Sequence, residues 1–213
     1  MELNKIYEGD SCCLIDELDK TPNLIIMSPP DIAETNYTLD QYKGFLRDIY
    51  IKCSEKLDEN GVMVSITTDR KMKGRIYTKH IDIINYTPLN LINYKIWAKS
   101  LKANLYILNF SHILCFSKSK KKTNNKFKEW YPDVLLIQRD NIKGYKNKDS
   151  FPTKLIEIIV GNYSNSGDLI LDPFMGTGKT GFVCKNLNRN YIGFELNSDN
   201  ITIAENLIEN NLI

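Results

Sequence analysis

The chain has 213 residues, of which 42% are hydrophobic and 25% charged, with a formal net charge of +2 at pH 7. This length suits one sizeable α/β core, residues 1–213 as a single domain, and is too short for two independent domains with a linker. Because no apolar run approaches the ~20 residues of a membrane span and no signal-peptide pattern is present, we expect a location in the cytoplasm, either of the source cell or of a host.

The predicted elements alternate between strands and helices along the chain. A buried strand is expected at Leu24–Met27, where a short apolar run lies between prolines. Asp40 is the expected N-cap of a helix that runs to Leu57. Further strands are predicted at 62–66, 94–98, 112–116, 169–171 and 191–194, and further helices at 81–86, about 155–159, 179–187 and 201–212. This alternation implies a mostly parallel sheet covered on both faces, which is a doubly wound α/β fold.

Metal and disulfide chemistry find no support in the sequence. The five cysteines are odd in number and scattered, and none has Cys-x-x-Cys or Cys/His ligand spacing. We therefore expect no metal site, and we interpret His80 and His112 as structural residues.

A glycine-containing turn follows the strand predicted near residue 170. Residues 178–180, Gly-Lys-Thr, match the end of a triphosphatase phosphate loop, but Pro173 stands where that loop needs its first glycine and removes a backbone N–H. We favour the alternative that Gly176 and Gly178 let the backbone pass close to a bulky cofactor. Glu195 comes 17 residues after Gly178, near the spacing expected for an acid that binds a ribose, so the segment suits a nucleoside-binding unit.

The stretch Asp172-Pro173-Phe174-Met175-Gly176-Thr177-Gly178 closely resembles the Asp-Pro-Phe-x-Gly-x-Gly motif of DNA amino-methyltransferases. The resemblance implies S-adenosylmethionine as the cofactor, with this loop near its methionine part, Glu195 on the ribose hydroxyls and Asp10 near the adenine. It also implies that the segment around Pro152 leads into the cofactor motif. The candidate cofactor-binding residues are Asp10, Pro152, Thr153, Asp172, Phe174, Gly176, Gly178 and Glu195.

A second motif, Ser28-Pro29-Pro30-Asp31, follows its strand as the catalytic Asp/Asn/Ser-Pro-Pro-aromatic motif does in the same family. The order of the two motifs resembles that of the circularly permuted β group, which has a Rossmann-like fold. All four residues are candidate catalytic residues, although Asp31 stands where the family has an aromatic residue that stacks on the target base. Tyr37 is the nearest aromatic side chain that could replace this contact.

The chemistry of the reaction explains why so short a motif suffices. A base amino group is a poor nucleophile because its lone pair is delocalised into the ring. The Ser28 hydroxyl and the Pro29 carbonyl can accept its two N–H bonds and turn the lone pair toward the sulfonium methyl, so catalysis is largely orientation and electrostatic stabilisation. The base must first leave the duplex stack. Carbon-5 methylation of cytosine would need an activated Cys in a Pro-Cys pair, which the sequence lacks.

The resemblance implies a restriction-modification DNA methyltransferase that acts on double-stranded DNA. Ser28 and the Phe151-Pro152 pair favour cytosine N4 as the target over adenine N6. Two further candidate functions are an RNA methyltransferase and, because of Asp31, a catalytically silent binding subunit.

Basic residues crowd two stretches, 70–79 and 118–128. The second stretch lies in a small recognition insert expected at about 117–150, where lysines could contact DNA phosphates or could line a solvated loop. Homodimer formation, common in the family, would help so small an insert cover a DNA site.

Overall fold

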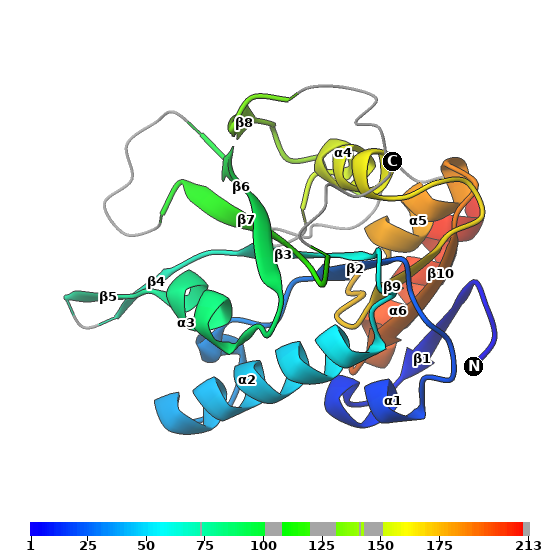
Figure 1. Ribbon diagram of the computed structural model, residues 1–213. Coiled ribbons are helices and arrows are strands. Elements are labelled where there is room, and N and C mark those ends of the chain that lie inside the picture. The colour runs from blue at the N-terminus through cyan, green and yellow to red at the C-terminus, as the bar shows by residue number, and fades with distance from the viewer. Residues whose placement is uncertain (73, 101–107, 120–130, 141, 143–150, 211–213) are drawn as a thin grey trace.

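The computed structural model describes residues 1–72, 74–100, 108–119, 131–140, 142 and 151–210 (Figure 1). Eight strands form one sheet in the order β1-β10-β9-β2-β3-β7-β6-β8. Their bounds are β1 Lys5–Glu8, β2 Leu24–Met27, β3 Val62–Thr67, β6 Asn90–Ala98, β7 Phe110–Ser117, β8 Val134–Leu136, β9 Leu169–Asp172 and β10 Asn190–Glu195. Pairs from β1 to β3 are parallel, β7 is antiparallel to both β3 and β6, and β8 is parallel to β6.

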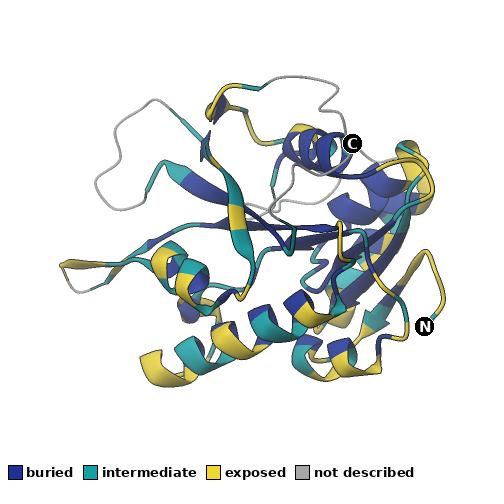
Figure 2. Cartoon of the chain, in the orientation of Figure 1, coloured by how far each residue is buried: buried dark blue, intermediate teal, exposed yellow. Residues whose placement is uncertain are grey.

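Helices cover both faces of the sheet. They are α1 Ser11–Glu17, α2 Leu39–Lys56, α3 Lys79–Tyr86, α4 Thr153–Tyr163, α5 Lys179–Asn186 and α6 Ser198–Asn210. One apolar cluster joins the sheet to α1, α2 and α3, and a second joins it to α4, α5 and α6. Strand β9 shows the division, because Leu169 and Leu171 belong to the first cluster and Ile170 to the second. The inner faces of the helices are accordingly buried and their outer faces exposed (Figure 2). The doubly wound, mostly parallel fold is confirmed.

Each strand and helix expected from the sequence is present, with ends that differ by a few residues. The N-cap predicted for α2 is wrong, because the cap is Thr38: its hydroxyl accepts from the N–H of Gln41 at 3.3 Å, and the Gln41 side chain accepts from the Thr38 N–H. Asp40 lies in the first turn instead. The sequence patterns did not predict β1, α1, β8 or a short 3-10 helix, η1, at Ile32–Glu34. They also did not predict a hairpin of β4 Arg70–Met72 and β5 Arg75–Tyr77, which projects from the body of the protein (Figure 1).

The direction of winding reverses between β2 and β9. These strands are parallel neighbours, with Leu24 opposite Ile170 and Ile25 opposite Leu171. The chain continues from β2 to β3 on one side and from β9 to β10 on the other. Ligands of doubly wound sheets bind at such a reversal, outside the carboxyl ends of the strands. The turns that begin at Ser28 and at Pro173 therefore lie side by side at this edge.

Buried polar contacts fix the turn between β9 and α5. The Asp172 carboxylate accepts from the Phe174 N–H at 3.0 Å and from the Thr180 hydroxyl at 2.6 Å. Burial raises the pKa of Asp172 to about 6 although both hydrogen bonds act to lower it. Asp172 therefore holds the shape of the turn but introduces a destabilising buried charge near neutral pH.

Gly178 ends the same turn in the left-handed region, with φ +83°. A Cβ at this position would lie 2.5 Å from Ala204 Cβ and 2.7 Å from Ala204 Cα on α6. The structure thus requires a glycine here for the turn and for the close approach of α6.

No described helix is both long enough and apolar enough to cross a membrane.

Replacing Gly178 by Ala should lower the free energy of unfolding by at least about 2 kcal/mol, because it combines a left-handed alanine with overpacking against α6. The matched control is Gly44→Ala in α2, where nothing lies within 4 Å of the added Cβ. That change should stabilise the protein by about 0.5–1 kcal/mol. Urea unfolding of both variants measures the difference, and equal stabilities would contradict the packing role of Gly178.

Replacing Asp172 by Asn should give a stability difference that depends on pH. The wild-type carboxyl has a folded pKa above its unfolded value of 3.8, so the folded state binds its proton more tightly and loses stability as the pH rises toward about 6. An asparagine side chain does not titrate and can keep both hydrogen bonds. The stability of the variant relative to wild type should therefore rise by roughly 2.4 kcal/mol between pH 4 and pH 7. If urea unfolding gave the same difference in free energy of unfolding between variant and wild type at every pH in this range, burial would not raise the pKa of Asp172.

Candidate active site

Three cavities meet at the reversal of the sheet, and Ser28 and Glu34 line all three. We name them by one residue of each. The Trp97 cavity has a volume of about 640 Å³, the Glu195 cavity about 670 Å³ and the Gly176 cavity about 300 Å³. The first two volumes are of the size that holds a nucleoside or another small ligand. Ser28 is therefore placed where two ligands could meet.

The Glu195 cavity lies over the carboxyl ends of β1, β9 and β10. Asp10, Phe174 and Glu195, three of the candidate cofactor residues, line it, and Gly176 lines the adjoining Gly176 cavity. Asp10 reaches this edge because β1 pairs with β10. Four of the eight candidate cofactor residues are thus brought together around two connected spaces.

The Glu195 carboxylate is held in a fixed orientation. Oε2 accepts from the Gly176 N–H at 2.7 Å, and Oε1 accepts from the Asn197 N–H at 2.9 Å and from Asn200 Nδ2 at 3.3 Å. Each oxygen has two lone pairs, so the carboxylate can still accept from a ligand hydroxyl. The Gly176 turn and the acid after β10 therefore form one unit, and a ligand would find the acid already oriented.

The other four candidates line none of the three cavities. Asp172 and Gly178 fix the shape of the turn between β9 and α5, as described above. Pro152 precedes the first residue of α4, and the Thr153 N–H donates to Asp140 Oδ2 at 2.9 Å. Their positions support the walls of the site rather than a direct contact with a ligand.

Lys179, which suggested a phosphate loop, is buried and its ammonium is bound by other groups of the protein. Its ammonium contacts both the carboxylate and the carbonyl of Asp140 and donates to the Phe151 carbonyl at 3.0 Å, while the lysine is only 5% exposed. Burial would raise the pKa of Asp140, but the Lys179 ammonium and the Thr153 N–H hold it below its ordinary value. Thr180 is likewise bonded to Asp172. Neither side chain is available to cradle a phosphate, which argues against the triphosphatase interpretation.

Asp31 has a clear structural role. Its carboxylate accepts from the Ala33 N–H at 3.0 Å at the start of η1, and the Glu34 carboxylate accepts from the Asp31 N–H at 2.7 Å. The same Asp31 carboxylate pairs with Arg70 at 2.8 Å. Asp31 therefore fixes the end of the Ser-Pro-Pro turn to the β4 strand.

Aromatic residues lie at the two larger cavities. Tyr37 lines the Glu195 cavity and contacts Phe45 with ring centroids 5.9 Å apart. The Trp97 cavity instead contains Trp97 and Phe151, whose rings meet edge to face with centroids 5.6 Å apart. Trp97 is fully buried, so of these two rings only the partly exposed Phe151 offers an aromatic contact to a planar ligand.

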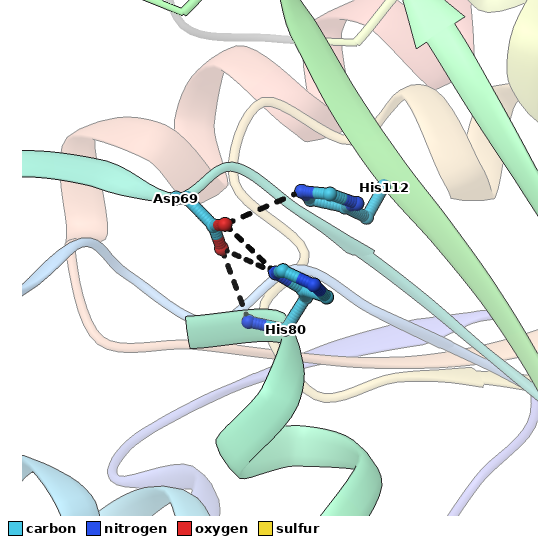
Figure 3. A group of neighbouring side chains, drawn as sticks. All are labelled: Asp69, His80 and His112. Atoms are coloured by element: carbon cyan, nitrogen blue, oxygen red, sulfur yellow. Dashed lines mark hydrogen bonds and ion pairs between the residues drawn. The ribbon is translucent and has the colours of Figure 1, made fainter. Parts of the chain in front are cut away.

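A compact cluster of Asp69, His80 and His112 adjoins the Trp97 cavity (Figure 3). His80 Nδ1 lies 2.9 and 2.7 Å from the two Asp69 oxygens, and His112 Nε2 lies 3.5 Å from Oδ2. Burial would raise the pKa of Asp69, but the two imidazoles hold it below its ordinary value. The three residues are of metal-ligand type, yet the rings stack nearly parallel with centroids 3.9 Å apart, so their lone pairs do not converge on one point. The geometry is that of a hydrogen-bonded His80–Asp69 pair with His112 stacked on His80.

The sequence reading missed several residues of the Trp97 cavity. Thr67 is the last residue of β3, the strand next to β2, and Asp69 comes two residues later. Ligands bind at the carboxyl ends of such strands, so the reasoning that placed Ser28 could also have found these two residues. Lys79 and Trp97 come from α3 and β6. No local pattern indicates these two, because the hairpin and the antiparallel strands bring them into place.

The comparisons with known proteins agree with this geometry. The model of the family described as DNA methylase (N6_N4_Mtase) matches residues 23–206. The type II methyltransferase M1.MboII of Moraxella bovis is 26% identical in an alignment covering 100% of this chain and 98% of the relative. The type II methyltransferase M.HpaI of Haemophilus parainfluenzae is 41% identical over 68 residues, which are 30% of this chain and only 22% of the relative's length.

Solved structures show the same fold. The PvuII DNA methyltransferase, described as cytosine-N4-specific, superimposes with a TM-score of 0.83 at 19% identity, covering 98% of this chain and 87% of that one. A DNA modification methylase of Thermus thermophilus, complexed with S-adenosyl-L-methionine, gives a TM-score of 0.77 at 22% identity, covering 98% and 94%. With a family match over most of its length, this chain belongs to the N6/N4 family of DNA methylases, amino-methyltransferases that use S-adenosylmethionine.

Proposed function

We propose that this protein is a site-specific DNA methyltransferase that transfers the methyl group of S-adenosylmethionine to N4 of cytosine. The observation that carries the proposal is the position of Ser28, which lines both large cavities where the sheet reverses. Donor and acceptor would approach it from opposite sides.

The proposed donor site is the Glu195 cavity together with the Gly176 cavity. The fixed carboxylate of Glu195 keeps one lone pair on Oε2 that can accept from a ribose hydroxyl, and Asp10 and Phe174 line the same space. The backbone at Gly176 leaves room for the methionine part, because only the Phe174 carbonyl oxygen lies within 4 Å of the place a Cβ would take. In this arrangement Asp172, Gly178, Pro152 and Thr153 act by holding the walls.

The proposed base site is the Trp97 cavity, which would receive a cytosine flipped out of the duplex. The Ser28 hydroxyl and the Pro29 carbonyl would accept the two amino N–H bonds, so that the nitrogen lone pair points at the sulfonium methyl. Phe151, which is partly exposed, supplies an aromatic surface that the fourth position of the motif does not. Pro30 and Asp31 would act on the shape of the turn: the Pro30 carbonyl accepts from the Tyr42 hydroxyl at 2.6 Å, and Asp31 pairs with Arg70.

Cytosine is favoured over adenine by the serine at the first motif position and by the cytosine-N4-specific description of the PvuII enzyme, which shares the fold. The relatives M1.MboII and M.HpaI are type II methyltransferases, so a role in restriction-modification is part of the proposal.

Positive charge at the Trp97 cavity suits contact with DNA phosphates. Arg70, Lys71, Lys99 and Arg139 line it. Of the predicted lysine cluster at 118–128, Lys118 is used inside the protein, where it donates to the Leu57 carbonyl at 2.6 Å and pairs with Glu59. The rest of that cluster, and most of the recognition insert at 117–150, lie outside the described residues. The insert, the single-domain organisation, the cytoplasmic location and a homodimer stay part of the proposal.

The direct test is to incubate the protein with labelled S-adenosylmethionine and duplex DNA, digest the DNA to nucleosides and identify the product. N4-methylcytosine is the expected product, and N6-methyladenine would move the assignment to adenine. Methylation of matched RNA but not DNA would overturn the DNA assignment. Bound donor without any methylated nucleic acid would favour the silent binding subunit.

Replacing Ser28 by Ala should lower the rate of methyl transfer by about 10²–10³-fold, because one of the two acceptors that orient the amino group is lost. The affinity for S-adenosylmethionine, measured by calorimetry, should stay within about twofold of wild type. Ser166→Ala is the matched control, since Ser166 is exposed before β9 at the opposite edge of the sheet. An unchanged rate in Ser28→Ala would remove Ser28 from the mechanism.

A further inference from the structure

Two polar side chains of the Trp97 cavity have no partner in the part of the chain that the structure describes. Thr67 is 3% exposed, and its hydroxyl makes no hydrogen bond there. Lys79 is 5% exposed, and among the described residues no hydrogen-bond acceptor or ion-pair partner contacts its ammonium. Buried polar groups in native proteins are nearly always paired, so two unpaired donors in one cavity indicate a ligand with acceptors.

The neighbouring acids do not account for these donors. Asp31, Glu34 and Asp69 line the same cavity and attract the Lys79 charge from beyond ion-pair distance. Asp31 is already paired with Arg70, and Asp69 with His80. Burial lowers the pKa of Lys79, while the three acids act in the opposite direction. The acids thus favour the ammonium form and leave its N–H groups free to bind a ligand.

Cytosine carries two acceptors beside its amino group. Along its pairing edge the amino group at C4 is followed by N3 and then by O2, and both are acceptors. Adenine has its amino group followed by N1 and then by the C2–H group, which accepts nothing. A base whose amino group is held by Ser28 and Pro29 therefore presents two acceptors to the rest of the cavity if it is cytosine and one if it is adenine.

We propose that Thr67 and Lys79 together donate to N3 and O2 of the flipped base and thereby select cytosine. This inference rests on the proposed function and adds the residues that determine its specificity. Adenine in the same cavity would leave one buried donor unpaired, which is how sites built to hydrogen-bond one substrate reject an analogue that lacks the group.

The first test compares Thr67→Val and Lys79→Met with wild type on genomic DNA that lacks methylated amino groups. Both variants should form N4-methylcytosine about 10- to 100-fold more slowly. The ratio of N6-methyladenine to N4-methylcytosine in the digested product should rise at least about tenfold, because the penalty against adenine is removed. Affinity for S-adenosylmethionine should be unchanged.

The controls separate selection from folding. Thr67→Ser keeps the hydroxyl and should keep the wild-type product ratio. Lys52→Met removes one lysine charge on α2, where Lys52 pairs with Asp16, and should also keep it. A wild-type ratio in both Thr67→Val and Lys79→Met would overturn the inference even if their rates fall, since a structural role lowers the rate without changing the choice of base.

The second test begins with wild-type protein, which avoids variants that could fail to fold. In a duplex carrying the protein's own site, mapped by sequencing methylated DNA, the target cytosine is replaced by a 2-aminopyridine nucleoside, which keeps the amino group and ring nitrogen but lacks O2. Wild type should methylate this analogue about 10- to 100-fold more slowly than cytosine. In Lys79→Met the rates on cytosine and on the analogue should differ much less. The intrinsic reactivity of the analogue is the same for both proteins, so it cancels when their rate ratios are compared.

The outcomes distinguish the two proposals. If wild type forms only N6-methyladenine on natural DNA, the cytosine assignment fails and the inference fails with it. If wild type forms N4-methylcytosine but methylates the analogue as fast as cytosine, the proposed function stands and the inference alone is wrong.

Discussion

The parallel pairing of β2 with β9 is the constraint on which the rest of the site depends. These two strands run side by side and lead into turns that separate in opposite directions. The turn after β2 carries Ser28, and the turn after β9 carries Phe174 and Gly176. Strand order alone therefore brings a ligand held by one turn next to a ligand held by the other. The two turns are far apart in the sequence. Every assignment made for the site uses this adjacency.

Around that adjacency, the protein holds its turns with polar groups that are paired inside the fold. Asp31 joins the Ser-Pro-Pro turn to Arg70, Asp172 ties the Phe174 turn to α5, and Glu195 joins that turn to the end of β10. Rigid turns of this kind suit a reaction whose catalysis is mainly orientation, since little reorganisation is then needed when the ligands meet. The departure from the family motif at Asp31 is consistent with this, because the residue contributes stiffness instead of an aromatic face.

The sequence predicted the framework well because its strongest signals are local. Short apolar runs between turn residues located β2, β9 and β10, and the two motifs placed their residues at the correct edge of the sheet. Local signals for two other features were present but overlooked: Thr38 and Asp31 each stand three residues before a Gln or Glu, which is the pattern of a capping box. Lys79 and Trp97 were beyond sequence reasoning, because they reach the Trp97 cavity only through strand pairing and the return of the chain after the hairpin. Gly178 was expected beside a cofactor, and the structure adds a packing role against Ala204 that no local pattern indicates.

The pairing of β1 with β10 has a consequence for how the protein reaches its native state. Lys5 lies opposite Ile192, so two segments from near opposite ends of the sequence must meet before this border of the sheet exists. Contacts of such large sequence separation form slowly, because a long loop must close before they contribute. A chain emerging from the ribosome thus carries Asp10 from the outset but cannot assemble the Glu195 cavity until β10 has been made. A small molecule that contacts both Asp10 and Glu195 would stabilise the pairing of these segments. The stability of the folded protein would then increase with the concentration of that molecule in the cell.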